Sequence, residues 1–182
     1  ACSCRCYARH ASSIRSLIKY LNEENMVFEQ GKTGIGSTEK LFDMFFTHVG
    51  THRDLGLTLQ NIEGDIAKIH LPFQSKHADS IENGSLHTTA IATAIDSACG
   101  CAVMLHLGKP AAIATVNLRI DYMRKPEPGR GLVIEASCYQ YAEDFIYVGA
   151  AAYQVNSKIM CCNAVGIFKS DTPGPVLGME IT

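Results

Sequence analysis

The spacing of apolar residues along the chain changes from a helical period to a strand period. Residues 38–49 follow a Ser37 or Thr38 cap and repeat apolar side chains every three or four positions, which predicts an amphipathic helix. Between residues 57 and 73, apolar and polar side chains alternate on both sides of a turn near Glu63 and Gly64, which predicts one or two strands. Residues 74–85 are polar and predict a loop.

The longest weakly charged stretch covers residues 88–107 and predicts one long helix. A helix of this length measures about 30 Å, which is enough to span a bilayer. However, Asp96 lies at its centre, where a carboxylate in lipid costs about 2.5–3.5 kcal/mol, and several threonines and His106 add further polarity. The pattern therefore favours the buried helix of a soluble protein over a membrane span.

Period-two alternation returns after this helix, in four segments at residues 115–123, 132–139, 145–154 and 158–168. Pro126, Pro128 and Gly129 interrupt the chain between the first two segments, and short polar turns separate the others. These breaks predict a meander of antiparallel hairpins. In the first segment, Thr115 falls on the polar side of the strand, whereas Val116 begins the apolar side.

Composition limits the classes of protein to which the chain can belong. Of its 182 residues, 47% are hydrophobic and 19% are charged, which suits a packed core and not a disordered chain. The formal charge of −2 and the pI near 6.4 leave no basic excess for binding phosphates. Nucleic acid is therefore not an expected partner, and one domain with a short extension is the expected organisation.

The first 37 residues differ in composition from the rest of the chain. Up to residue 20 they contain four basic residues, four serines and no acid, which resembles a mitochondrial transit peptide. The simpler interpretation is an extension with one short helix at residues 13–24, followed by a glycine-rich linker. We expect an extension at residues 1–37, a domain at 38–170 and a tail at 171–182. The expected location is cytoplasmic, with a mitochondrial location as the alternative.

The eight cysteines do not follow a disulfide or metal pattern. The last five lie among apolar residues, so Cys99, Cys101, Cys138 and one of Cys161 and Cys162 are expected to be reduced core residues. The cysteines at positions 2, 4 and 6 lack the spacing of zinc ligands. No metal site is therefore expected.

The predicted elements together describe an α+β fold in which a curved antiparallel sheet surrounds one central helix. Within it, residues 83–96 (NGSLHTTAIATAID), 115–123 (TVNLRIDYM) and 124–129 resemble the hot-dog-fold acyl-CoA thioesterases of the phenylacetate-pathway type. The resemblance covers residues 38–169, and its most specific feature is Leu86-His87 followed by an acid nine residues later. It implies the hot-dog fold and the hydrolysis of acyl-CoA thioesters.

Asp96 is the leading catalytic candidate. A carboxylate on an otherwise apolar helix is unfavourable unless it has a partner or a chemical task. The resemblance implies that Asp96 is the general base or nucleophile and that Thr115 orients water. It also implies that Arg124 and Lys125, at the end of the strand, contact the phosphates of coenzyme A.

The start of the same helix supplies a second group of candidates. His87 and Thr88 stand where the chain enters the helix, so their backbone N–H groups lack partners within it and can form an oxyanion hole. The His87 side chain can equally make a hydrogen bond within this turn. Thr88 and Asp96 are eight residues apart, about 12 Å of helix, which is too far for both to act on one carbonyl. At least a homodimer, or a tetramer made of two dimers, is therefore expected.

Two features depart from the family pattern. Thr88 and Thr89 follow His87, where the family usually has Gly-Gly, and Asn83 lies four residues before His87 instead of the usual six. Asn83 is nevertheless kept as a candidate catalytic residue. A non-catalytic acyl-CoA-binding protein and a hot-dog hydroxyacyl dehydratase are the alternatives to hydrolysis. Coenzyme A would be part of the substrate, so no separate cofactor is expected.

Overall fold

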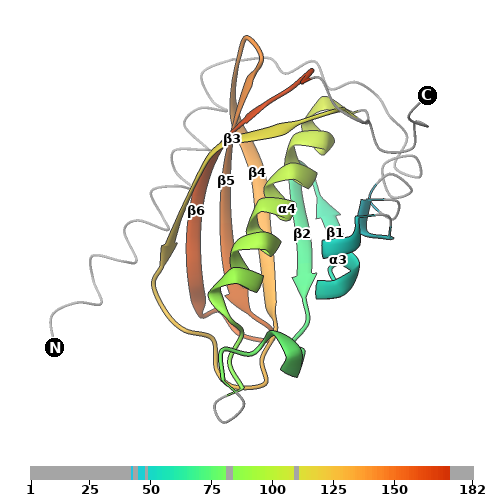
Figure 1. The fold of residues 1–182 in the computed structure, drawn as a ribbon. Coiled ribbons are helices and arrows are strands. Elements are labelled where there is room, and N and C mark those ends of the chain that lie inside the picture. Colours follow the sequence, from blue (N-terminus) through green and yellow to red (C-terminus); the bar gives the residue numbers. More distant parts are fainter. Residues whose placement is uncertain (1–41, 43–44, 48, 81–83, 109–110, 173–182) are drawn as a thin grey trace, which may run out of the picture. The chain divides into compact units, whose positions relative to one another are not determined.

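The computed structural model describes residues 42, 45–47, 49–80, 84–108 and 111–172 (Figure 1). The predicted extension, its helix and its cysteines lie outside the described residues, as does Asn83. The described helices are α3 Gly50–Leu55, the 3-10 turn η1 Ser75–His77 and α4 Thr88–Leu107. The strands are β1 Thr58–Glu63, β2 Ile66–Leu71, β3 Ala114–Tyr122, β4 Leu132–Ala142, β5 Phe145–Gln154 and β6 Met160–Lys169.

The strands form one antiparallel sheet in the order β1-β2-β4-β5-β6-β3. The predicted meander is therefore wrong for its first pair, because β3 pairs with β6 at the far edge and β4 pairs with β2. The connection across residues 123–131 contains two prolines and crosses from one side of the sheet to the other, which a tight hairpin turn does not do. The two later hairpins, β4–β5 and β5–β6, are confirmed.

Helix α4 lies across one face of the curved sheet and packs against β4, β2 and β5 (Figure 1). Its limits agree with the predicted 88–107. Small residues such as Ala94 and Ala98 face the sheet and are fully buried, which lets the strands approach the helix backbone closely. The helix is long and apolar enough for a bilayer, but 67% of its apolar stretch is buried inside the fold. Together these features are the α+β, hot-dog arrangement that the sequence predicts.

Local chemistry fixes the ends of these elements. His87 caps the start of α4, and Gly108 ends it in the left-handed conformation, with a φ of 62°. Glu143 and Asn156 adopt positive φ in the two hairpin turns, where short connections between antiparallel strands require it.

The region before the sheet was predicted incompletely. Residues 42 and 45–47 are helical, in agreement with the helix predicted at 38–49, and the remaining positions of that segment other than Val49 are not described. The additional helix α3 was not predicted, because Gly50, Thr51 and His52 show no apolar repeat. His52 and Leu55 nevertheless become buried.

The described cysteines are all free thiols. Cys99 and Cys101 are buried and Cys138 is half-buried, as expected. Cys161 and Cys162 are both buried, although only one was expected to be. Alternation along a regular strand would expose one of two neighbours, but Cys161 is the extra residue of a β-bulge, because Cys162 pairs with Ala152 and the next paired residue is Met160, opposite Tyr153.

Candidate active site

Asp96 and Thr115 meet on the side of α4 that faces the edge strand β3. The Thr115 Oγ1 hydroxyl donates a hydrogen bond of 2.8 Å to Oδ1 of Asp96. Asp96 is half-buried and Thr115 is exposed. The carboxylate is thus held in one orientation, and one of its oxygens has no protein donor among the described residues.

A β-bulge in β3 makes this contact possible. Thr115 pairs with Phe168 of β6, but the next paired residue is Asn117, opposite Ile167, so Val116 is the extra residue. Strict alternation predicts Thr115 on the polar side, together with Asn117. The bulge changes this, because Thr115 shares the side of buried Phe168 and faces the helix. The predicted side of the strand for Thr115 is therefore wrong. The structure places its hydroxyl in contact with Asp96.

The start of α4 holds His87 and Thr88 in different roles. Nδ1 of His87 accepts a hydrogen bond of 3.1 Å from the N–H of Thr89, so the ring caps the helix. Because Nδ1 is an acceptor, Nε2 carries the ring proton in the neutral form, and it belongs to an exposed side chain. The His87 N–H donates to the carbonyl of His77 at 2.8 Å. His87 is thus not a free backbone donor, and Thr88 provides the N–H that begins the helix without an acceptor inside it.

One stripe of α4 is left uncovered by the rest of the described fold. Thr88 is exposed, and Ala92 and Asp96, at spacings of four residues, are half-buried. From Ser97 to Met104 every residue of the helix is buried. The stripe therefore presents both the helix N-terminus and the carboxylate, about 12 Å apart along the axis.

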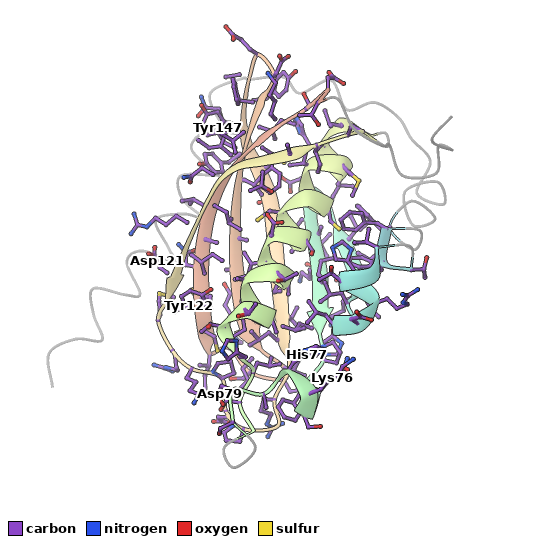
Figure 2. All side chains as sticks on the ribbon, viewed as in Figure 1. Lys76, His77, Asp79, Asp121, Tyr122 and Tyr147 are labelled. Carbon is purple, nitrogen blue, oxygen red and sulfur yellow. The ribbon has the colours of Figure 1, made fainter. Side chains whose placement is uncertain are left out.

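Arg124 and Lys125 lie in the loop that leaves β3. The backbone N–H groups of Met123 and Arg124 both donate to the carbonyl of Cys161, at 2.9 and 3.1 Å. Lys125 forms an ion pair with Asp79, which lies at the end of the fold where α4 begins (Figure 2). This ion pair lowers the pKa of the Asp79 carboxyl. Of the two basic residues that the resemblance places near coenzyme A phosphates, Lys125 is therefore already paired.

Sequence reasoning missed a buried polar pair directly behind Asp96. Nδ1 of His52 donates to the carbonyl of Phe45 at 3.1 Å, and Nε2 lies 2.8 Å from the hydroxyl of Ser97. Burial lowers the pKa of His52, although the Phe45 carbonyl and the negative charge of Asp96 partly oppose that shift. A polar residue at position 97 of an apolar helix was the available signal, but its partner comes from α3, which the sequence pattern does not reveal.

The thiol nearest to Asp96 along the helix is not a competing nucleophile. Cys99 is fully buried, and burial followed by the nearby charge of Asp96 raises its pKa far above the usual value. The thiol stays protonated at neutral pH, and a protonated thiol is a poor nucleophile.

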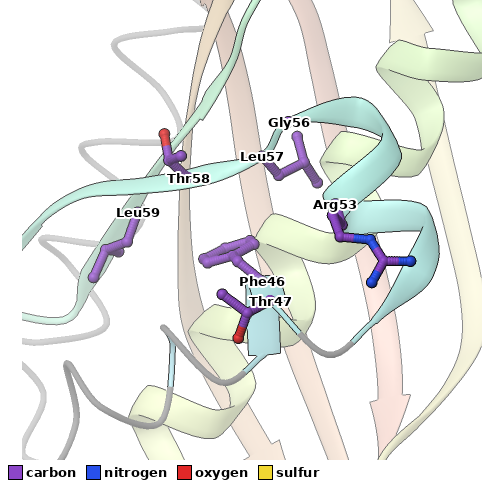
Figure 3. A pocket seen from close by; sticks show the side chains of 7 residues that line it. All are labelled: Phe46, Thr47, Arg53, Gly56, Leu57, Thr58 and Leu59. Atoms are coloured by element: carbon purple, nitrogen blue, oxygen red, sulfur yellow. The ribbon is translucent and has the colours of Figure 1, made fainter.

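A groove of about 450 Å³ opens on a different part of the fold (Figure 3). It lies where α3 ends and the edge strand β1 begins. Its lining residues are Phe46, Thr47, Arg53, Gly56, Leu57, Thr58 and Leu59. None of the predicted site residues lines it.

Comparison with known proteins gives this arrangement a context. The thioesterase superfamily model matches residues 83–161, which contain α4, β3, β4, β5 and the start of β6. A protein from Halobacterium salinarum with a provisional esterase assignment is 33% identical over 87 residues. That match takes in 46% of this chain and 56% of the relative, so the chain spans little more than half the length of this curated protein.

Solved structures share the fold over most of the described residues. A Pseudomonas aeruginosa protein is 28% identical, with a TM-score of 0.66 over 72% of this chain and 98% of its own. The Escherichia coli PaaI protein, from the phenylacetic acid degradation operon, is 11% identical, with a TM-score of 0.64 over 76% and 97%. Mouse thioesterase superfamily member 2 is 19% identical, with a TM-score of 0.61 over 74% and 96%. The last two similarities show a common fold.

Proposed function

We propose that this chain, a hot-dog-fold member of the thioesterase superfamily, hydrolyses acyl-CoA thioesters. The observation that carries the proposal is the hydrogen bond from Thr115 to Asp96 on the uncovered stripe of α4. It holds a carboxylate on the same stripe as the start of a helix, and that helix start offers a backbone N–H at Thr88. A base and an oxyanion donor are the two groups that thioester hydrolysis requires.

In the proposed reaction, water adds to the thioester carbonyl carbon while Asp96 takes its proton. The carbonyl oxygen gains negative charge and is stabilised by the N–H of Thr88 and by the positive end of the helix dipole. The carbon–sulfur bond then breaks, and the proton passes to the leaving thiolate to give free coenzyme A and a carboxylic acid. Direct attack by the Asp96 carboxylate, followed by hydrolysis of the anhydride, gives the same products.

Two copies of the chain are needed to assemble this site. Thr88 and Asp96 of one helix are about 12 Å apart, so the N–H that serves one Asp96 comes from a second subunit. The edge strand β3 supports this arrangement, because β6 is its only partner among the described strands and because Val116 is 54% and Tyr122 48% exposed. Tyr122 lies on this strand in Figure 2. We propose a homodimer through this edge, with pairing of dimers into tetramers.

The nucleotide part of coenzyme A would bind near the loop after β3. Arg124 is exposed there, and its backbone is fixed by the carbonyl of Cys161. A guanidinium binds phosphate oxygens in pairs, so Arg124 is the better phosphate ligand than Lys125, which is paired with Asp79. Coenzyme A enters as part of the substrate, and the proposed reaction uses no separate cofactor.

A non-catalytic acyl-CoA-binding protein is the second candidate. It is favoured by the threonine side chains at the helix start, which restrict the approach of a carbonyl to the Thr88 N–H. It is also favoured by the capping bond, which already uses the N–H of Thr89.

Hydrolysis of a panel of acyl-CoA esters, followed by thiol release, tests the proposal. Asp96→Asn should lower kcat by at least about 100-fold with an unchanged circular dichroism spectrum, because it removes the base and keeps the size of the side chain. Near-normal hydrolysis by this variant would remove Asp96 from the mechanism. If the unaltered chain binds acyl-CoA but hydrolyses no ester, it is the binding protein.

Sedimentation should give at least two chains, and an active monomer would contradict the shared site.

A further inference from the structure

Gln154 is a buried polar residue that the reaction scheme above does not use. It is the last residue of β5 and is only 5% exposed. It continues the core-facing side of that strand, after the buried residues Ile146, Val148, Ala150 and Ala152. A polar side chain is unfavourable at such a position unless all of its polar atoms have partners.

Both polar atoms of the Gln154 amide bind one residue of the loop between β3 and β4. Its Oε1 accepts a hydrogen bond of 2.9 Å from the backbone N–H of Glu127. Its Nε2 donates a hydrogen bond of 3.0 Å to Oε2 of Glu127. An amide is the side chain that offers an acceptor and a donor side by side, so the pair is chemically matched.

The position of Glu127 gives this contact a consequence for the proposed site. Glu127 lies three residues after Arg124. The N–H of Arg124 donates to the carbonyl of Cys161 in β6. The loop is thus held at two points, at the N–H groups of Met123 and Arg124 and at Glu127. A third contact, of 2.7 Å, joins the Gly129 N–H to the carbonyl of Gly84, four residues before Thr88. The loop that carries Arg124 and the start of α4 are therefore joined.

We propose that Gln154 is a positioning residue for binding the coenzyme A part of the substrate. Through Glu127 it fixes the loop after β3, so that Arg124 meets the phosphates while the thioester lies at the start of α4. This inference rests on the proposed function. A rigid loop lowers the ordering cost of binding, so loosening it should weaken binding of the nucleotide portion and spare the chemical step.

The test compares two thioesters that have the same acyl group. One is the coenzyme A ester, and the other is the N-acetylcysteamine ester, which has no nucleotide and no phosphate. Gln154→Glu keeps the shape of the side chain but places a second carboxylate against Glu127. It should raise KM for the coenzyme A ester about tenfold with kcat within about twofold, and change kcat/KM for the short ester less than about twofold.

Two further variants separate positioning from general damage. Gln154→Glu combined with Glu127→Gln restores a donor opposite an acceptor, and should return KM to within about twofold of the original value. Gln140→Glu makes the same change at an exposed site on β4 and should leave KM and kcat unchanged for both esters. Equal losses on both esters, or no rescue by the double variant, would overturn the positioning role and leave Gln154 purely structural.

Coenzyme A binding by calorimetry distinguishes failure of this inference from failure of the proposed function. If the chain binds coenzyme A but hydrolyses neither ester, the proposed hydrolysis is wrong, and a roughly tenfold weaker Kd for Gln154→Glu still supports the positioning role. An unchanged Kd in a folded Gln154→Glu variant would refute it. A chain that binds no coenzyme A and hydrolyses neither ester refutes both.

Discussion

Replacing Thr115 by valine tests the contact on which the proposed site depends. The valine side chain keeps the branched shape of threonine and removes only the hydroxyl that donates to Asp96 at 2.8 Å. Because Thr115 is exposed, the free energy of unfolding should change by less than about 0.5 kcal/mol. Any large effect of the substitution is therefore an effect on the carboxylate and not on the fold.

The size of the effect follows from the type of hydrogen bond. A hydrogen bond to a charged group contributes about 1.5–3 kcal/mol, and every 1.4 kcal/mol corresponds to a tenfold change. Loss of the bond from Thr115 should lower kcat by about 10- to 100-fold, because the Asp96 carboxylate then samples orientations that do not face the substrate. Thr115→Ser keeps the hydroxyl and should stay within about threefold of the original rate.

The decisive assay combines this change with Asp96→Asn and measures kcat on one good acyl-CoA substrate. If Thr115 acts through Asp96, the double variant should be no slower than Asp96→Asn alone, because the hydroxyl has no charged base left to orient. Independent losses that multiply in the double variant would refute this reasoning and give Thr115 a separate role. An unchanged rate for Thr115→Val would show that the contact has no catalytic role.

Three other predictions concern the surroundings of the site. Asp79→Asn releases Lys125, so KM for acyl-CoA should fall about two- to fivefold at low salt and the gain should vanish at high salt; a rise in KM would contradict this. Burial lowers the pKa of His52 from its usual 6.5, so its contribution to stability is full above pH 6.5 and is lost as the pH falls through the lowered value. Between pH 7.5 and 5, the unfolding temperature of His52→Gln should therefore fall less than that of the original chain. An equal fall in both would exclude His52 as a source of the pH dependence of stability. Thr88→Gly should raise kcat/KM for bulky acyl groups more than for small ones, and an equal effect on both would show that the threonine does not limit space.

The sequence was informative wherever local chemistry decides the structure. The limits of α4 follow from the His87 cap, the glycine at position 108 and a continuous apolar stretch between them. The turns at Glu143 and Asn156 are likewise determined by a few neighbouring residues. Asp96 could be singled out because a carboxylate inside such a helix is unfavourable without a role.

Predictions failed where distant residues decide. The direction of the Thr115 side chain depends on a bulge that appears only when β3 pairs with β6, more than 40 residues later in the chain. The partner of the His87 N–H is the carbonyl of His77, which a loop brings to the helix start. The pairing of Lys125 with Asp79 also joins two separate loops. Alternation along one strand, or the end of one helix, contains no information about these partners.

The wrongly predicted position of β3 has the largest consequence for function. Had β3 formed a hairpin with β4, as the pattern suggested, it would lie beside β4 and not beside β6. At the edge beside β6, it has no second neighbour among the described strands and turns Thr115 toward Asp96. The Asp96 carboxylate then lies beside the outer edge of β3, and in the proposed dimer the second subunit that supplies the Thr88 N–H would approach along that edge. The crossover through residues 123–131 therefore leaves β3 at the sheet edge next to Asp96, the proposed base, and carries Arg124, the proposed phosphate ligand, in the loop that follows β3.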